Sequence, residues 1–188
     1  MTTPTALIPA QAAARLDDYT VIDVRTPGEY ASGHLPGAHN IPLDHLHTAL
    51  PALKAAASRG TLLMVCASGN RSATACTELA AAGIPATTLA GGTTAWAGEG
   101  HTLLRPENAP AVWPMERQVR LAAGSLVALG LAAGTRWRPA RWLSAAIGTG
   151  LVFSAATNTC GMAAVLAKLP HNRPRTTDLL TTLRVLQD

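Results

Sequence analysis

One cysteine of this sequence lies where the chain favours nucleophilic chemistry. Cys66 opens the segment Cys-Ala-Ser-Gly-Asn-Arg, which ends at Arg71. The apolar run 61–65 before it is typical of a buried strand, and the alanine-rich run 72–82 after it is typical of a helix, so the segment is a strand-to-helix turn. The positive end of the helix and the Arg71 guanidinium both favour a thiolate over a thiol. Cys66 is therefore the predicted nucleophile.

The small residues of this turn predict a loop that binds negative charge. Gly69 lets the backbone bend sharply because it has no Cβ, and its small neighbours let successive N–H groups turn inward as an anion-binding nest. We expect the positions that follow the cysteine to bind substrate, namely Ala67, Ser68, Gly69, Asn70 and Ser72.

The regions around the turn predict an α/β domain. Strand-like and helix-like runs alternate along residues 1–107, and such alternation implies a parallel sheet covered by helices on both faces. The predicted strands are 20–24, 61–65 and 86–89, and the predicted helices are 9–16, 43–58 with an interruption at Pro51, 72–82 and 93–96. Cys66 then lies at the C-terminal end of a strand, where folds of this kind bind ligands.

Several segments together resemble the rhodanese family of sulfurtransferases. The motif Cys-x-x-Gly-x-Arg after a strand is similar to the active-site loop of that family. Further matching segments occur in the family's order: Val-Ile-Asp-Val-Arg at 21–25, Glu-Tyr at 29–30, Gly-His-Leu-Pro-Gly-Ala-His-Asn-Ile-Pro at 33–42, and Gly91-Gly92 followed by Trp96. The resemblance covers about residues 5–107 and implies the rhodanese-like form of the parallel α/β sheet.

The resemblance implies sulfur transfer in two steps. The Cys66 thiolate attacks the outer sulfur of an anionic donor such as thiosulfate, whose oxygens face Arg71 and the loop N–H groups. The resulting persulfide passes its sulfur to cyanide or to a thiol, and no cofactor is expected. The resemblance also gives Asp23 and Arg25 a role in holding the loop. An ordinary salt bridge at the strand end is the alternative for this pair.

Two other functions remain open at this point. Phosphatases and arsenate enzymes of a related fold also use a cysteine-arginine loop, but theirs has one residue more than the four that separate Cys66 from Arg71. A membrane-tethered thiol sensor, sulfur carrier or transport component would use the same thiolate without turnover.

The other cysteines and the histidines predict neither a disulfide framework nor a metal site. The three cysteines are odd in number and form no Cys-x-x-Cys pair, which is typical of a reducing compartment. Cys76 lies within the helix after the turn and has no basic neighbour there, which favours a packing role. His45 and His47 are two residues apart and would face different sides of a helix.

The second half of the chain differs from the first in charge and hydropathy. Residues 1–107 carry six Lys/Arg and eight Asp/Glu, a net charge of −2, whereas residues 108–188 carry nine and three, a net charge of +6. The arginines flank two apolar runs, 121–135 and 142–167, without interleaved aromatic residues, which favours a membrane over nucleic acid as the partner. A crossing needs about 20 apolar residues. The second run, of 26 residues, is long enough, whereas the first, of 15, needs Val119 and residues 135–137 to extend it while arginines snorkel. On this joint interpretation we expect a two-helix transmembrane hairpin.

Small and aromatic residues of this half fit such a hairpin. Tryptophans 113, 137 and 142 fall where an interfacial belt would lie, and Gly130-x-x-x-Gly134 would allow close approach of helices, within one chain or in a homodimer. A buried helical pair in a soluble domain is the alternative, and it would need a polar stripe. Basic residues beside both hairpin ends, and an N-terminus without a signal-peptide pattern, favour a cytosolic catalytic domain.

This half also resembles the YgaP-type transmembrane domain that follows a rhodanese domain in some bacterial inner-membrane proteins. The resemblance rests on Glu-Arg-Gln-Val-Arg at 116–120, Ala-Gly at 123–124, Thr-Cys-Gly-Met at 159–162 and Leu-Pro-His-Asn at 169–172. It implies an inner-membrane location. Cys160 would lie near the cytosolic end of the second helix, where it either receives sulfur from Cys66 in a relay or packs beside Gly161.

The predicted organisation has four parts. These are a catalytic domain over residues 1–107, a linker over 108–116, the hairpin over 117–170 and a cytosolic tail over 171–188. Leucines at 179, 180, 183 and 186 predict a short amphipathic helix in the tail, which would lie on the membrane or pair with a second subunit.

Overall fold

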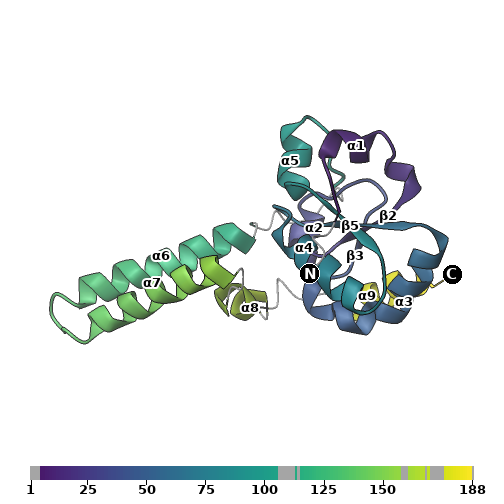
Figure 1. Ribbon diagram of the computed structural model, residues 1–188. Helices are drawn as coiled ribbons and strands as arrows, with labels where there is room; N and C mark the ends of the chain where they lie inside the picture. The colour runs from purple at the N-terminus through teal and green to yellow at the C-terminus, as the bar shows by residue number, and fades with distance from the viewer. Residues whose placement is uncertain are drawn as a thin grey trace. The chain divides into compact units, whose positions relative to one another are not determined.

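The chain forms two compact units in the computed structural model, which describes residues 5–105, 113, 115–157, 161–167, 169 and 176–187. The first unit combines Met1–Val112 with Arg173–Asp188, and the second unit is Trp113–Asn172 (Figure 1). The C-terminal segment therefore returns to the unit from which the chain started.

The first unit is built on a five-stranded sheet with the order β1-β5-β4-β2-β3. Its strands are β1 (Ala6–Leu7), β2 (Tyr19–Asp23), β3 (His39–Asn40), β4 (Thr61–Val65) and β5 (Ala86–Leu89), and every pairing is parallel. The central strand β4 is buried from Leu62 to Val65, because a parallel sheet has helices on both faces. Asp23 pairs with Val65 in the register, so β2 and β4 end together, just before Cys66.

Helices cover both faces of this sheet, as predicted. Alternate residues of β4 separate two cores: Leu62 and Met64 join the core beneath α3 (Leu46–Arg59) and α4 (Asn70–Ala81), whereas Leu63 and Val65 join the core beneath α1 (Pro9–Ala13) and α5 (Gly92–Gly98). Figure 1 shows α1 and α5 on one side of the sheet and α3 on the other. The remaining short elements are α2 (Pro27–Ala31) and the single turns Leu16–Asp18 and Leu43–His45.

The proline at position 51 does not interrupt its helix. The sequence predicts an interruption between 43 and 58, but α3 runs continuously from Leu46 to Arg59 with Pro51 inside it. Proline removes one backbone hydrogen bond from a helix. The apolar face of α3 compensates, since Leu46, Leu53 and three alanines of this helix are buried against the sheet.

The second unit is a helical hairpin with a short third helix. α6 (Met115–Ala133) and α7 (Ala140–Thr157) pack side by side, and α8 (Gly161–Ala167) follows them (Figure 1). The described part of the apolar run 142–167 is helical in α7, which ends at Thr157, and in α8, which begins at Gly161. Within the described residues, none of the helices has both the length and the apolar character that a membrane crossing requires.

The two long helices of the hairpin approach closely at glycines, as predicted. A Cβ on Gly130 would lie 2.4 Å from the Ser144 hydroxyl oxygen, and one on Gly134 would lie 2.4 Å from Cγ of Arg141. The Ser144 hydroxyl donates to the Val127 carbonyl at 2.9 Å, and Arg141 Nε donates to the Gly134 carbonyl at 3.1 Å. The absence of side chains at both glycines is therefore what lets the helices meet.

The hairpin exposes large apolar side chains along its length. Among the described residues of α6, α7, α8 and the turn between α6 and α7, these are Leu121, Leu126, Leu129, Leu131, Trp137, Trp142, Leu143, Leu151, Val152, Phe153 and Val165. Many exposed large apolar side chains on one unit are typical of a surface that faces lipid or another protein.

The predicted amphipathic helix of the tail is α9 (Thr176–Val185), but its apolar face is buried within the first unit. Leu179 and Leu183 are partly buried against the core under α3, and Leu186 is 2 % exposed within it. The predicted position on the membrane or against a second subunit is therefore corrected, because the domain's own core covers Leu179, Leu183 and Leu186, three of the four predicted leucines.

Replacing Gly130 by valine should disrupt the hairpin. The Cβ of valine would lie 2.4 Å from the Ser144 hydroxyl oxygen and would carry two further methyl groups, and overpacking of this kind costs about 1–3 kcal/mol. Gly124→Val is the matched control, since it stands on the same helix and a Cβ there meets nothing within 4 Å. Thermal unfolding of the detergent-purified chain, followed by helical circular dichroism, should show a lower midpoint for Gly130→Val alone. Equal midpoints for the two variants would contradict the packing described.

Candidate active site

Cys66 lies directly after β4, and its sulfur is enclosed by the turn that follows. The residue has 0 % exposure. The Gly69 N–H donates to Sγ at 3.1 Å, and the Ser72 hydroxyl lies 3.5 Å from Sγ. Gly69 adopts a φ of +99°, in the left-handed region, and caps the start of α4. The loop thus directs donors and a helix N-terminus at one sulfur, an arrangement that stabilises negative charge on it.

The backbone of this loop is held from outside by the start of α5. The Thr93 N–H donates to the Cys66 carbonyl at 2.8 Å, and the Thr94 N–H donates to the Ala67 carbonyl at 3.0 Å. A Cβ on Gly92 would lie only 2.2 Å from the Cys66 carbonyl oxygen, so only glycine permits this contact. Because the Cys66 and Ala67 carbonyls bond to α5, the N–H groups of the same two peptide bonds, those of Ala67 and Ser68, point away from α5.

Arg71 forms a two-pronged ion pair with Glu29 across the loop. Nη1 donates to Oε2 at 2.9 Å and Nη2 donates to Oε1 at 2.8 Å, with the Glu29 side chain 2 % exposed and the Arg71 side chain 26 % exposed. Glu29 also accepts from the Thr26 N–H at 3.1 Å as the third helical residue of α2. The pair therefore joins the start of α4 to the start of α2.

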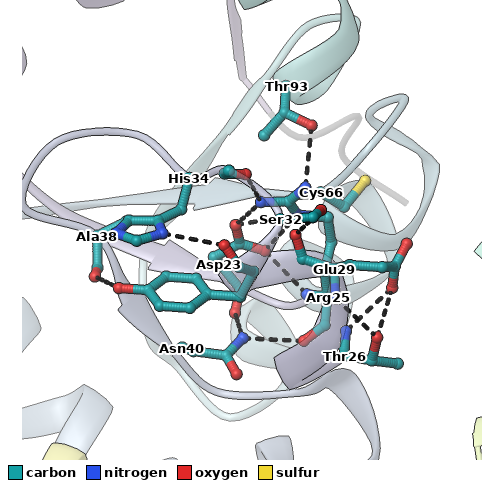
Figure 2. A network of polar contacts seen from close by, with 12 residues as sticks. Asp23, Arg25, Thr26, Glu29, Ser32, His34, Ala38, Asn40, Cys66 and Thr93 are labelled. Atoms are coloured by element: carbon teal, nitrogen blue, oxygen red, sulfur yellow. Dashed lines mark hydrogen bonds and ion pairs between the residues drawn. The ribbon is translucent and has the colours of Figure 1, made fainter. Parts of the chain in front are cut away.

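Asp23 and Arg25 form a second buried ion pair, which Figure 2 shows at the centre of a polar network. Arg25 Nη2 donates to Asp23 Oδ2 at 2.6 Å and to the Gly33 carbonyl at 2.7 Å, and Nη1 donates to the Thr93 hydroxyl at 3.3 Å. The Asn40 amide donates to the carbonyls of Asp23 and Arg25. Since Thr93 binds the Cys66 carbonyl, the predicted pair reaches the loop through one intermediate residue.

A pair of hydroxyl groups lies under the sulfur. The Ser72 hydroxyl lies 2.7 Å from the Thr88 hydroxyl of β5 and donates to the Gly69 carbonyl at 3.0 Å. Both residues are buried. The oxygen that faces Sγ is thus kept in place by a partner on the neighbouring strand.

The other predicted site residues occupy different positions around the loop. Ala67 is buried, whereas Ser68 and Asn70 are exposed at its outer surface. Cys76 packs in the core under α3 and α4, as predicted. Cys160 lies outside the described residues. Within the ranges that the structure describes, no three His, Cys, Asp or Glu residues are grouped to hold a metal.

Four residues of the site were not identified as such from the sequence. Glu29 has a local signal, because Thr26-Pro27-Gly28-Glu29 predicts a capping box, but that pattern does not reveal Arg71 as a partner. Gly92 and Thr93 come from a segment that contacts the loop only in the folded chain. Thr88 is a polar residue at the buried end of a strand, which is the one feature that marks it.

Comparison with known proteins agrees with this geometry. A family model for the rhodanese-like domain matches residues 8–99, and one described as "Inner membrane protein YgaP-like, transmembrane domain" matches residues 112–175. An uncharacterised protein of Synechocystis is 36 % identical over 165 residues, which are 87 % of this chain and 89 % of the relative. A sulfurtransferase of Allochromatium vinosum is 32 % identical over 99 residues, 52 % of this chain and 90 % of the relative.

A solved structure extends the comparison to the fold. The rhodanese-related protein of Thermoplasma volcanium has a TM-score of 0.51 and 29 % identity, and the match covers 54 % of this chain and 99 % of that one. The chain accordingly belongs to the rhodanese-like family, and a YgaP-like transmembrane domain follows its rhodanese-like domain. Both predicted resemblances are confirmed. They support a sulfurtransferase-type role and a membrane location.

Replacing Glu29 by glutamine should destabilise the first unit. The substitution leaves the partly buried Arg71 charge without its carboxylate partner, which we expect to lower the free energy of unfolding by about 2 kcal/mol or more. Glu78→Gln is the matched control, since Glu78 stands on α4 and is 34 % exposed. The free energy of unfolding of both variants is measured by urea denaturation. Equal loss in the two variants would contradict a structural role for the Arg71–Glu29 pair.

Stability should also depend on pH through Cys76. Burial raises the pKa of this thiol from its ordinary value of 9.0 to about 11. The unfolded chain therefore loses this proton at lower pH than the folded chain, so the contribution is complete below pH 9 and disappears as pH rises toward 11. Relative to Cys76→Ala, the unfolding free energy of the natural chain should decline by about 1 kcal/mol for each pH unit in this window. If the unfolding free energies of the natural chain and of Cys76→Ala changed with pH in the same way, the prediction would be contradicted.

Proposed function

We propose that this protein is a membrane-anchored sulfurtransferase that moves a sulfane sulfur from thiosulfate or a related donor through a Cys66 persulfide to cyanide or a thiol. The observation that carries the proposal is the 3.1 Å hydrogen bond from the Gly69 N–H to the Cys66 sulfur inside a strand-to-helix loop. A donor aimed at the sulfur itself suits a cysteine that becomes negative and then carries one more sulfur atom.

The first half-reaction forms the persulfide. The Cys66 thiolate attacks the outer sulfur of thiosulfate, a new S–S bond forms to Cys66, and the old S–S bond breaks with its electron pair leaving on sulfite. Arg71 meets the donor's oxygens at the exposed part of its side chain, while Glu29 fixes its position. Because Cys66 has no exposed surface, the loop has to open as the donor enters.

The second half-reaction removes the terminal sulfur from Cys66. A nucleophilic acceptor, such as the carbon of cyanide or a thiolate, attacks the terminal sulfur and takes it, and the bonding pair returns to Cys66 as a thiolate. The loop N–H groups from Ala67 to Ser72 stabilise the negative terminal sulfur between the two steps. The Ser72 hydroxyl, held in place by Thr88, lies 3.5 Å from the sulfur on the side of the helix.

The placement of the domain completes the proposal. Positive charges beside both ends of the hairpin, at Arg117, Arg120, Lys168, Arg173 and Arg175, favour a catalytic domain on the cytosolic side of the inner membrane. There the reducing environment keeps Cys66 available between turnovers. The apolar exterior of the hairpin is also the surface through which two copies would form a homodimer.

Mass measurement of the intact, detergent-purified chain tests the chemistry. Incubation with thiosulfate should add one sulfur atom, and cyanide should then remove it as thiocyanate over many turnovers. Cys66→Ser should take up no sulfur, whereas Cys76→Ala should behave like the natural chain because Cys76 lies in the core. Uptake of sulfur without discharge to any acceptor would favour a carrier or sensor, and no uptake at Cys66 would contradict the proposal.

A further inference from the structure

The C-terminal helix joins the catalytic unit after the chain has passed through the hairpin. Residues Met1–Val112 and Arg173–Asp188 form one compact unit, and the sixty residues between them, Trp113–Asn172, form the other. Within the first unit, α9 contacts α3 and β3. In Figure 1, α9 lies beside α3 on the face of the sheet opposite α1 and α5.

The contact of α9 is made by an apolar face. Leu179, Leu183 and Leu186 recur at helical spacing and pack against the core under α3, with Leu186 only 2 % exposed. On the outer side, Leu180 is 57 % exposed and Val185 is 54 % exposed. Leu186 belongs to the same core cluster as Met64 and Cys66, so α9 closes the core that underlies the active-site loop.

The Arg59 side chain forms hydrogen bonds to the residues that directly follow α9. Arg59, the last residue of α3, donates from Nη2 to the Leu186 carbonyl at 2.7 Å and from Nη1 to the Gln187 carbonyl at 3.2 Å. The last carbonyls of a helix lack partners within it and carry partial negative charge, so a guanidinium is a favourable partner there. Packing and hydrogen bonding therefore both specify where α9 binds.

We propose that α9 is an integral part of the sulfurtransferase domain and that the hairpin is an insertion within that domain. A domain folded on one side of a bilayer can bury Leu186 only if the segment after the hairpin returns to that side. Both ends of the hairpin then lie at the same face of the membrane, and the turn around Arg138 lies at the other. This inference rests on the membrane anchoring proposed above and is independent of the sulfur chemistry.

Paired leucine substitutions test the docking of α9 in the full chain. Leu186→Asp places a charge in the core, whereas Leu180→Asp places one on the exposed side of the same region. Amide hydrogen exchange in detergent should accelerate about tenfold or more along α3 in Leu186→Asp and stay unchanged in Leu180→Asp. Arg59→Met should accelerate exchange of the α9 amides. Identical exchange in both leucine variants would overturn the docking.

Single-cysteine labelling in intact cells tests the topology. In a chain with Cys66→Ser, Cys76→Ala and Cys160→Ser, cysteines are introduced as Thr77→Cys on α4, Arg138→Cys in the hairpin turn and Gln187→Cys after α9, all at exposed positions. A membrane-impermeant maleimide should label position 138 from outside, and positions 77 and 187 only after the cells are opened. Labelling of 77 and 187 from opposite sides would overturn the inference, as would labelling of all three from one side.

The experiments distinguish a failure of the proposed sulfur transfer from a failure of the proposed insertion of the hairpin. Loss of sulfur uptake at Cys66 with the expected labelling pattern would remove the chemistry and leave the inserted hairpin. Labelling of positions 77 and 187 from opposite sides, in a chain that forms the persulfide, would remove the inserted hairpin and leave the chemistry.

Discussion

The active-site loop depends on the close packing of its backbone against the start of α5. The Gly92 backbone lies so near the Cys66 carbonyl that a Cβ would come within 2.2 Å of the oxygen, and the Thr93 and Thr94 N–H groups bond the first two loop carbonyls. A peptide group that directs its carbonyl outward directs its N–H inward. The two peptide groups that follow Cys66 are therefore fixed by their contact with α5.

Two ion pairs connect the elements that surround the loop. The Asp23–Arg25 pair connects the end of β2 to the Thr93 hydroxyl, and the Arg71–Glu29 pair connects the start of α4 to α2. Each pair removes charged groups from water and offsets that cost with several hydrogen bonds, which ties the elements into one arrangement. Cys66 is therefore held by the end of β4, by the start of α4 and by the start of α5.

The sequence predicts the parts of this architecture that depend on local pattern. The alternation of strands and helices, the position of Cys66 after a buried strand, and the close helix contact at Gly130 follow from periodicity, residue size and motif spacing. The end of α7 at Thr157 was not predicted, because apolar composition does not mark where a helix ends. Nor was the continuity of α3 through Pro51, which tertiary packing stabilises against the local preference of proline.

Contacts between residues far apart in the sequence account for the rest. Glu29 and Arg71 are 42 residues apart, and each has a sufficient local explanation, as a capping residue and as a residue of the loop. Leu186 reaches the core only after the whole hairpin has intervened, so its amphipathic pattern predicted the helix without its partner. A hydrophobic pattern indicates that a face is covered, and the identity of what covers it is fixed by the fold.

The most direct test of this account is the rate of persulfide formation in Gly92→Ala during a single turnover with thiosulfate. Gly83→Ala is the control, because Gly83 also has a positive φ, +72°, but a Cβ there meets nothing within 4 Å. The account predicts that Gly92→Ala, still folded by circular dichroism, forms the Cys66 persulfide at least about tenfold more slowly, a loss of about 1.4 kcal/mol of transition-state stabilisation, whereas Gly83→Ala reacts like the natural chain. Formation at the natural rate in Gly92→Ala would show that the loop does not depend on its packing against α5.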